Sequence, residues 1–229
     1  MLRPTVLKLS LQPHEPHENE IHHQENFRMK WFYNNQGVSF VSYNSEQMKW
    51  LNEAMEEIKS SLTGRQLLQR IDAALRSKQL KLSIHLSTQD TGVKAHKDRY
   101  AGNYLGTGSD FYCNLRQNSQ MREDERKKEN ACIVFHELLH VLHNLEGKRL
   151  MNSELNQGFH PLLLEEAKTV GLGKYSAGNL SENAFRYEKG YPRRTFYQHY
   201  NDITVNDDDT VRKGPGNHIS KFPPLYFKK

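Results

Sequence analysis

The stretch from Ala131 to Leu145 constrains this chain more than any other part of its sequence. It reads A-C-I-V-F-H-E-L-L-H-V-L-H-N-L and contains the pattern H-E-x-x-H at His136, Glu137 and His140. On an α-helix, residues four positions apart project from one face, so the two imidazoles can bind a single Zn²⁺. Glu137 lies between them and could take the proton from a metal-bound water.

The surroundings of this pattern favour a metal site over a chance occurrence among the twelve histidines of the chain. A helix that is apolar almost all round is buried, and unpaired titratable groups are costly there. A satisfied polar core is the alternative interpretation. His143 follows His136 by seven positions and lies near the same face. We expect it to support a ligand or pack beside one, because three ligands from one straight helix would spread along its axis.

Length, charge and cysteine content exclude several other classes of protein. A chain of 229 residues suits one domain with tails, and a net charge of +5 does not require a nucleic-acid partner. Cys113 and Cys132 imply no disulfide framework and suit a reducing cytosol. No apolar run reaches transmembrane length, and the first residues lack the apolar region of a secretory signal peptide. We expect a monomer with neither a nucleic-acid nor a membrane partner.

The chain divides into three segments. Residues 1–27 are polar and rich in Pro and His, cannot bury enough apolar area to fold, and are interpreted as a disordered leader. Residues 28–200 are expected to form the folded domain, and residues 201–229 a polar tail. Within the domain, the pattern predicts a hairpin over 30–43, helices over 45–62 and 66–77 separated at Thr63-Gly64, and a half-buried strand over 80–86.

The segments on either side of the metal-binding helix are predicted as follows. Residues 109–115 form a short strand, interpreted as an exposed edge that pairs with an extended substrate through Ser109, Asp110 and Phe111. Residues 117–130 form a charged loop. Pro161 begins a further helix that ends near Gly171, and a shorter helix runs from a cap at Ser181 to about residue 189.

A catalytic zinc site needs three protein ligands and an open position, so a third ligand must come from elsewhere. The carboxylates of Glu146, Glu165 and Glu166 are the candidates. Glu146 stands where H-E-x-x-H-x-x-G-x-x-H carries its last ligand, but His143 replaces the Gly, so the helix is expected to carry Glu146 away. Glu165 and Glu166 follow three leucines, and one could bind the ion while the other orients a His. An ordinary polar helix face is the alternative.

Together, H-E-L-L-H-V-L-H-N-L and L-E-E-A-K-T-V-G-L resemble the gluzincins, most closely the clostridial neurotoxin light chains. Those proteins pair a H-E-L-x-H-x-x-H helix with an E-E-L-R-T-x-G-G segment whose second glutamate binds zinc. The resemblance implies Glu166 as the third ligand with Glu165 behind it. The light chains also carry an R-x-x-Y pair that supports the transition state, which implies roles for Arg194 and Tyr197 in R-R-T-F-Y. Arg193 is expected to face the substrate. The neurotoxins are much larger, so this relationship is distant.

A closer resemblance covers nearly the whole chain. The motifs G-T-G-S-D-F-Y-C-N-L, A-C-I-V-F-H-E-L-L-H, P-L-L-L-E-E-A-K-T-V-G-L-G, L-S-E-N-A-F-R and P-R-R-T-F-Y, in this order, are similar to the NleD family of type III secreted effector metalloproteases. This resemblance implies a bacterial effector delivered into the host cytosol. It also implies cleavage of host stress-activated MAP kinases of the JNK class in the activation loop, at the T-x-Y segment.

These observations predict an α+β, zincin-like metalloprotease domain of the gluzincin type, with a small mixed sheet whose edge strand lies beside the H-E-x-x-H helix. The expected activity is that of a zinc endopeptidase with one catalytic Zn²⁺, in which Glu137 is the general base and Tyr197 and Arg194 stabilise the oxyanion. The alternatives are an effector that keeps the zinc site only to bind a host protein, and a protease with a different host signalling substrate.

Overall fold

A computed structural model of the chain describes residues 37–42, 44–86, 90–150, 161–195, 203–205 and 211–213. Its helices are α3 (Ser45–Ser60), α4 (Leu62–Lys78), α5 (Asp98–Ala101), α6 (Glu123–Glu146), α7 (Pro161–Val170) and α8 (Glu182–Glu188), with short 3-10 turns at Arg116–Asn118 and Gly173–Ala177. The strands are β1 (Val38–Ser42), β2 (Leu82–Leu86), β3 (Gly92–Ala95), β4 (Ser109–Cys113), β5 (Ile203–Val205) and β6 (Val211–Lys213). The predicted leader and most of the predicted tail lie outside these residues.

The main sheet has four strands in the order β1-β2-β4-β3. β1, β2 and β4 are parallel, and β3 pairs antiparallel with β4. Alternate residues of β2 and β4 are buried, which reflects the two-residue period of a strand with one face on the core. The mixed sheet with flanking helices confirms the predicted α+β class.

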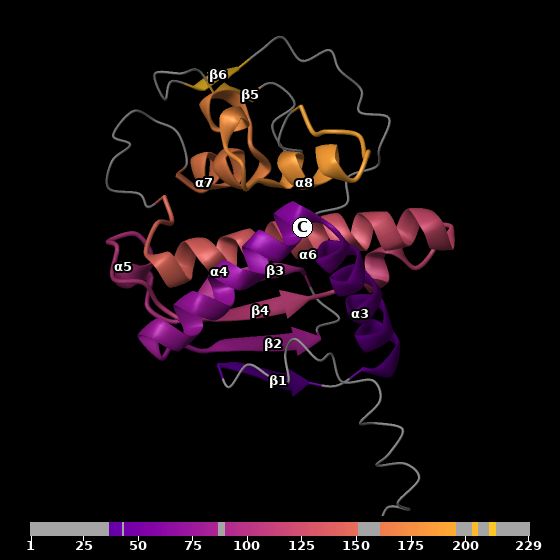
Figure 1. The fold of residues 1–229 in the computed structure, drawn as a ribbon, viewed down its shortest axis with the longest axis horizontal. Helices are drawn as coiled ribbons and strands as arrows, with labels where there is room; N and C mark the ends of the chain where they lie inside the picture. Colours follow the sequence, from indigo (N-terminus) through magenta and orange to yellow (C-terminus); the bar gives the residue numbers. More distant parts are fainter. Residues whose placement is uncertain are drawn as a thin grey trace, which may run out of the picture.

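Helix α6 lies at the centre of the molecule. Figure 1 shows the sheet on one side of α6 and helices α7 and α8 on the other. The core that joins these layers includes fully buried aromatic and aliphatic side chains from α3, α4, α6, α8 and the sheet, among them Leu51, Ile71, Phe111, Phe135 and Phe185. The apolar flanks of the metal-binding pattern therefore anchor α6 from several directions.

Capping explains where the first two helices begin and end. The side chain of Asn44 accepts a hydrogen bond from the Gln47 backbone N–H and starts α3. Ser61 ends α3 and also caps α4, because its hydroxyl accepts from the Gly64 N–H at 2.8 Å. The break between the two helices therefore lies at Ser61, not at Thr63-Gly64 as the sequence suggested.

Two further predictions about elements need correction, and a third, the hairpin over 30–43, is not tested by the described residues. β4 is paired on both sides, with β2 and β3, and Ser109 and Phe111 are fully buried, so β4 is not the edge strand. The edge beside β4 is β3. Residues 117–130 are only partly a loop, because α6 begins at Glu123, where three acidic residues occupy its first turn. Finally, β1 pairs with β2, and the first arm of the predicted hairpin lies outside the described residues.

Within the described ranges, no helix is both long enough and apolar enough to cross a bilayer.

Candidate metal centre

The H-E-x-x-H residues occupy the buried middle of α6. His136, Glu137 and His140 keep only 6 to 8% of their surface exposed. Apolar neighbours on α6 pack into the core, and the helix ends at Gly147, whose backbone adopts the left-handed conformation (φ +71°). Helical periodicity thus puts both imidazoles on the side of α6 that faces α7 and α8.

Three electron-pair donors converge at this point. The Nε2 atoms of His136 and His140 lie 3.1 Å apart, and the two carboxylate oxygens of Glu166 on α7 lie 2.9 Å and 3.2 Å from them. Ligands about 2.0–2.1 Å from a tetrahedral zinc are separated by roughly 3.3–3.4 Å, so the spacing here is close to that of a zinc site. Among the described residues, these three form a group that could hold a metal ion.

The other nitrogen of each imidazole faces a carboxylate. His136 Nδ1 lies 2.8 Å from Glu182 Oε2 on α8, and His140 Nδ1 lies 3.2 Å from Glu165 Oε1 on α7. A neutral imidazole that donates from Nδ1 leaves a lone pair on Nε2. In that neutral tautomer, both Nε2 atoms would present lone pairs, with Glu166, to a cation placed between them. Without a cation, a proton takes its place at neutral pH, because the neighbouring carboxylates raise the pKa of His136. This donor set fits a cation, and the outer carboxylates hold both rings in the ligating tautomer.

Glu165 holds a second histidine as well. Its Oε1 lies 2.5 Å from His143 Nδ1, and its Oε2 accepts a hydrogen bond from the Leu150 N–H at 2.9 Å. Together with His140 and His143 it forms a second group with metal-ligating atoms close together. Because Glu165 is fully buried and already bonded to both rings and to a backbone N–H, the geometry suits it to orienting His140. The first group keeps both Nε2 atoms and is the better match for a ligand set.

Glu182 is a site residue that the sequence analysis did not single out. Its two oxygens accept hydrogen bonds from Arg186 Nε at 2.6 Å and from Arg194 Nη1 at 2.9 Å, in addition to the contact with His136. Glu182 and Arg186 are both buried. One signal was present in the sequence: Glu182 follows a helix cap in a segment whose helix also carries an Arg four positions later. That pattern is common on solvated helices, and only the packing of α8 on α6 distinguishes it.

The charges of the site shift the pKa values of its own groups. Burial lowers the pKa of His136, but hydrogen bonds to Glu166 and Glu182 outweigh it and raise that pKa to about 9. Burial likewise opposes ionisation of Glu166 and Glu182, yet the imidazoles beside Glu166 and the guanidinium groups beside Glu182 hold their pKa values low. Both carboxylates are therefore anionic at neutral pH, as ligation and orientation of a ligand require.

Glu137 has a different environment from the other carboxylates. Burial raises its pKa, and only part of this effect is offset by His136 and His140. Among the described residues its carboxylate makes no hydrogen bond or ion pair. Burial is the main cause of the raised pKa of the Cys113 thiol, and the charge of Glu137 adds to it, which indicates that Glu137 lies near the end of β4. A carboxylate that is close to the ligands but not engaged by them can accept and release a proton.

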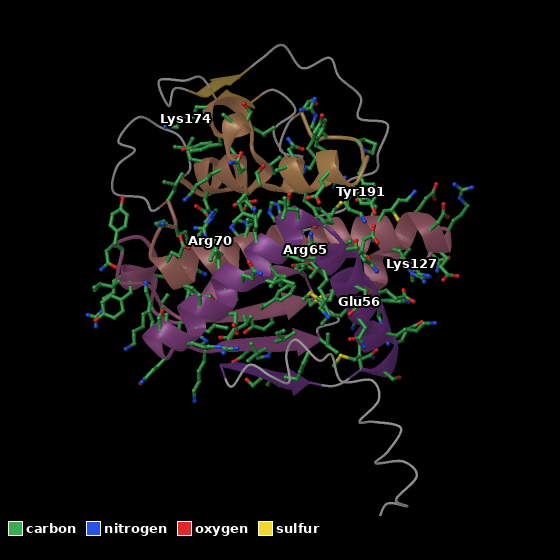
Figure 2. All side chains as sticks on the ribbon, in the orientation of Figure 1. Glu56, Arg65, Arg70, Lys127, Lys174 and Tyr191 are labelled. Atoms are coloured by element: carbon green, nitrogen blue, oxygen red, sulfur yellow. The ribbon has the colours of Figure 1, made fainter. Side chains whose placement is uncertain are left out.

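Three other residues named in the sequence predictions are engaged with partners other than the ligand group. Glu146 points away from the ligands and pairs with Arg70 of α4, labelled in Figure 2, and with Lys148, which rules it out as the third ligand here. The Arg194 guanidinium donates from Nη1 to Glu182 Oε2 at 2.9 Å, the same oxygen that faces His136 Nδ1. Arg193 lies over the ring of Tyr187, with 5.5 Å between Cζ and the ring centroid.

Of the remaining predicted residues, Tyr197 is not described and the three residues of β4 need a revised role. Tyr197 lies outside the described residues. Ser109 and Phe111 are buried in β4, and Asp110 faces His85 across the sheet at 3.1 Å, so none of the three offers a free strand edge to a substrate. The interpretation of these residues as a substrate-pairing edge is wrong, because β3 covers that side of β4.

Comparison with known proteins gives one match. The model of the Peptidase_M91 family, described as an effector protein, matches residues 38–197, which is more than half of the chain and includes every element of the site. No curated protein matches the sequence.

Proposed function

The chain belongs to the Peptidase_M91 family of effector proteins, and from this premise we propose that it is a zinc-dependent endopeptidase. Membership makes it a peptidase of the effector class, with a metal cofactor, a host protein as substrate and delivery into host cells. The observation that carries the finer proposal is the convergence of His136, His140 and Glu166, with both imidazoles held in the ligating tautomer by outer carboxylates.

In this proposal, His136, His140 and Glu166 hold the ion. When bound, zinc would polarise the scissile carbonyl and lower the pKa of a water molecule to about 7. Glu137 accepts the proton of the attacking water and passes it to the departing amine. Its raised pKa suits this exchange, because a base that releases its proton again must not be too acidic.

Arg194 and Tyr197 keep proposed roles on the oxyanion side, with a change for Arg194. Because its guanidinium donates to Glu182, we assign it an indirect effect: it holds the charge of the carboxylate that orients His136. Tyr197 follows three residues later and remains the proposed donor to the oxyanion. Arg193 remains a proposed substrate contact.

For substrate binding, we assign the edge-strand role to β3 instead of β4. β3 pairs with β4 on one side, and the described part of the chain supplies no strand on its other side. An extended peptide can add to such an edge through main-chain hydrogen bonds. In Figure 1, β3 is the strand of the sheet nearest α6. A peptide on this edge would run close to the metal-binding helix.

The proposed substrate is a stress-activated MAP kinase of the JNK class, cut in its activation loop, after secretion by a type III system. The support for both points is the resemblance of the ordered motifs to the NleD family. The test is incubation of a purified JNK-class kinase with the zinc-loaded protein, with the chelated protein and with Glu137→Gln, followed by mass spectrometry of the products. Cleavage by the zinc-loaded wild type alone supports the proposal. Zinc-dependent binding of the kinase without cleavage would support the non-catalytic alternative.

A further inference from the structure

One end of the molecule carries a group of cations that the metal site does not use. They lie at the start of α5 and just after α6: Lys97, which precedes the helix, Arg99 and Arg149. None has a carboxylate partner among the described residues. Lys97 and Arg99 are exposed and lie over the Tyr100 ring, with Nζ and Cζ 5.6 Å and 4.6 Å from its centroid, a contact that leaves their charge open to an acidic group. Between Lys97 and Leu105 the sequence contains a single acidic residue, Asp98. This surface is therefore locally positive, although the net charge of the whole chain is only +5.

Two large apolar side chains stand among these cations. Tyr104 is 77% exposed and Leu105 is 61% exposed. We call these five residues, Lys97, Arg99, Tyr104, Leu105 and Arg149, the α5 surface. A single exposed apolar residue needs no explanation, but two adjacent ones at the tip of a cationic loop combine an apolar contact with charge.

The loop that presents them is fixed to the metal-binding helix. The Tyr104 N–H donates to the Gly147 carbonyl at 2.8 Å, the Thr107 N–H donates to the Asn144 carbonyl at 2.9 Å, and the Arg149 N–H donates to the Ala101 carbonyl at 2.8 Å. A side chain at Gly147 would clash with the Tyr104 backbone, 2.6 Å from its Cα. The two segments thus pack backbone to backbone.

Tyr104 also adopts a costly conformation. Its φ is +66°, in the left-handed region that bulky residues avoid. The hydrogen bonds to α6 maintain this conformation while the ring stays exposed, so the fold retains a strained residue without burying its side chain.

The α5 surface lies close to the site. Gly147 follows His140 by seven residues, roughly 10 Å along the helix axis. An extended peptide spans about 3.3 Å per residue, so a chain held at the metal site would reach this distance after about three residues.

From these observations we infer that the α5 surface binds an acidic segment of the substrate, with an apolar side chain beside the acids, three to six residues from the scissile bond. The inference rests on the proposed endopeptidase function. Acidic side chains complement cations that have no carboxylate partner among the described residues, and an apolar side chain can pack on Tyr104 and Leu105. The surface would select substrates and speed their binding without contacting the reacting atoms.

The test uses the zinc-loaded full chain and a peptide library prepared from a host-cell proteome, with cleaved bonds identified by mass spectrometry. Wild type should enrich Asp and Glu three to six positions from the cleaved bond. In Lys97→Glu/Arg99→Glu/Arg149→Glu this enrichment should fall roughly three- to tenfold and Lys and Arg should be enriched instead, since each exposed pair contributes modestly. The wild-type preference should also weaken in high salt.

A matched control makes three charge reversals of the same sign at the other end of α6, so its net charge equals that of the triple variant of the α5 surface. Lys49→Glu/Arg122→Glu/Lys128→Glu lies near the first turns of α6, where Figure 2 labels Lys127, and should retain the acidic preference. Tyr104→Gly should fold at least as stably as wild type, because Gly accepts the positive φ, yet cleave acidic peptides several-fold less efficiently in kcat/KM.

The possible results separate this inference from the proposed function. If peptides are cut without acidic enrichment, or if charge reversal leaves that enrichment unchanged, the α5 surface does not bind an acidic segment. The endopeptidase function stands in both cases. Equal kcat/KM for Tyr104→Gly and wild type would show that the Tyr104 ring does not contribute to substrate binding. A zinc-loaded wild type that cuts neither the peptides nor the kinase contradicts the proposed function itself, and the inference with it.

Discussion

At the scale of single residues, Glu137 differs from its neighbours because it is buried without a hydrogen bond among the described residues. We predict that Glu137→Gln lowers kcat by roughly 10²–10⁴ and leaves zinc content unchanged, since a general base is lost but no ligand is. Steady-state cleavage and metal analysis of the same preparation measure both. Near-normal turnover in the variant would contradict the assigned base.

The same substitution should change how stability depends on pH. Burial raises the pKa of Glu137, so the folded chain holds this proton more tightly than the unfolded chain. Its contribution to the free energy of unfolding is present at low pH and is lost as pH rises above the unfolded value of about 4.3. In chelated protein, Glu137→Gln should therefore raise Tm more at pH 8 than at pH 4.

Glu166 on α7 and Glu146 at the end of α6 are the two carboxylates to compare as candidates for the third ligand. We predict that Glu166→Gln loses zinc on dialysis, because one of three ligands is removed, whereas Glu146→Gln retains it. Glu146 is partly exposed and bonded to Arg70 and Lys148, so its loss should cost about 1 kcal/mol or less in stability. Zinc retained by Glu166→Gln and lost from Glu146→Gln would reverse the ligand assignment.

Tyr197 is the residue whose proposed role depends most on the resemblance. Tyr197→Phe should lower kcat by roughly 10²–10³ with little change in zinc content, because the phenol donates to charge that develops in the transition state. Kinetics on a folded MAP kinase measure the effect. A change confined to KM would mean that Tyr197 binds the substrate only, and wild-type kinetics would remove it from the mechanism.

At the scale of elements, α8 connects the metal site to the rest of the fold through the two carboxylates at its ends. Glu182 faces His136, whereas Glu188 accepts hydrogen bonds from Thr63 at the start of α4. We predict that Glu182→Gln weakens zinc binding roughly 10–100-fold. It should also lower the free energy of unfolding by about 3 kcal/mol, because Arg186 and Arg194 lose the charge of a shared carboxylate, although Arg186 keeps Glu129 at 3.6 Å.

Glu188→Gln is the matched control on the same helix. It should cost roughly 1 kcal/mol, typical of a lost helix cap, and leave zinc affinity unchanged. Chelator competition and denaturant unfolding measure the two quantities separately. If both variants weaken zinc binding alike, α8 acts on the site only through general stability.

At the scale of the whole molecule, the predicted leader and the folded domain should be separable. Deletion of residues 1–27 should leave cleavage by the purified protein intact and prevent its delivery into host cells, because that polar segment offers little apolar area to a core. Assays of the truncated protein in solution and in an infection experiment test the two halves. Loss of activity in solution would assign these residues to the folded enzyme.

Local patterns in the sequence were sufficient for the parts of the site that lie on one helix. The four-residue spacing of His136 and His140, with Glu137 between them, follows from helical periodicity, and the apolar flanks predict burial. The predicted cap at Ser181 likewise involves a hydrogen bond to a residue three positions away, whereas α3 is capped by Asn44 and not by Ser45, the residue that the sequence favoured. Such interactions depend on neighbours along the chain, so the sequence alone contains them.

Contacts between distant segments could only be identified in the tertiary structure. Glu166 reaches His136 across 30 residues, and Glu182 reaches it across 46. The edge position of β3 depends on the antiparallel addition of a strand that precedes β4 in the chain. By itself, the sequence determined the two imidazoles, the base beside them and the pair of glutamates that could complete the site, but not Glu182. The packing of α7 and α8 on α6 decided which carboxylate meets which imidazole nitrogen, because that choice depends on distances that no local spacing encodes.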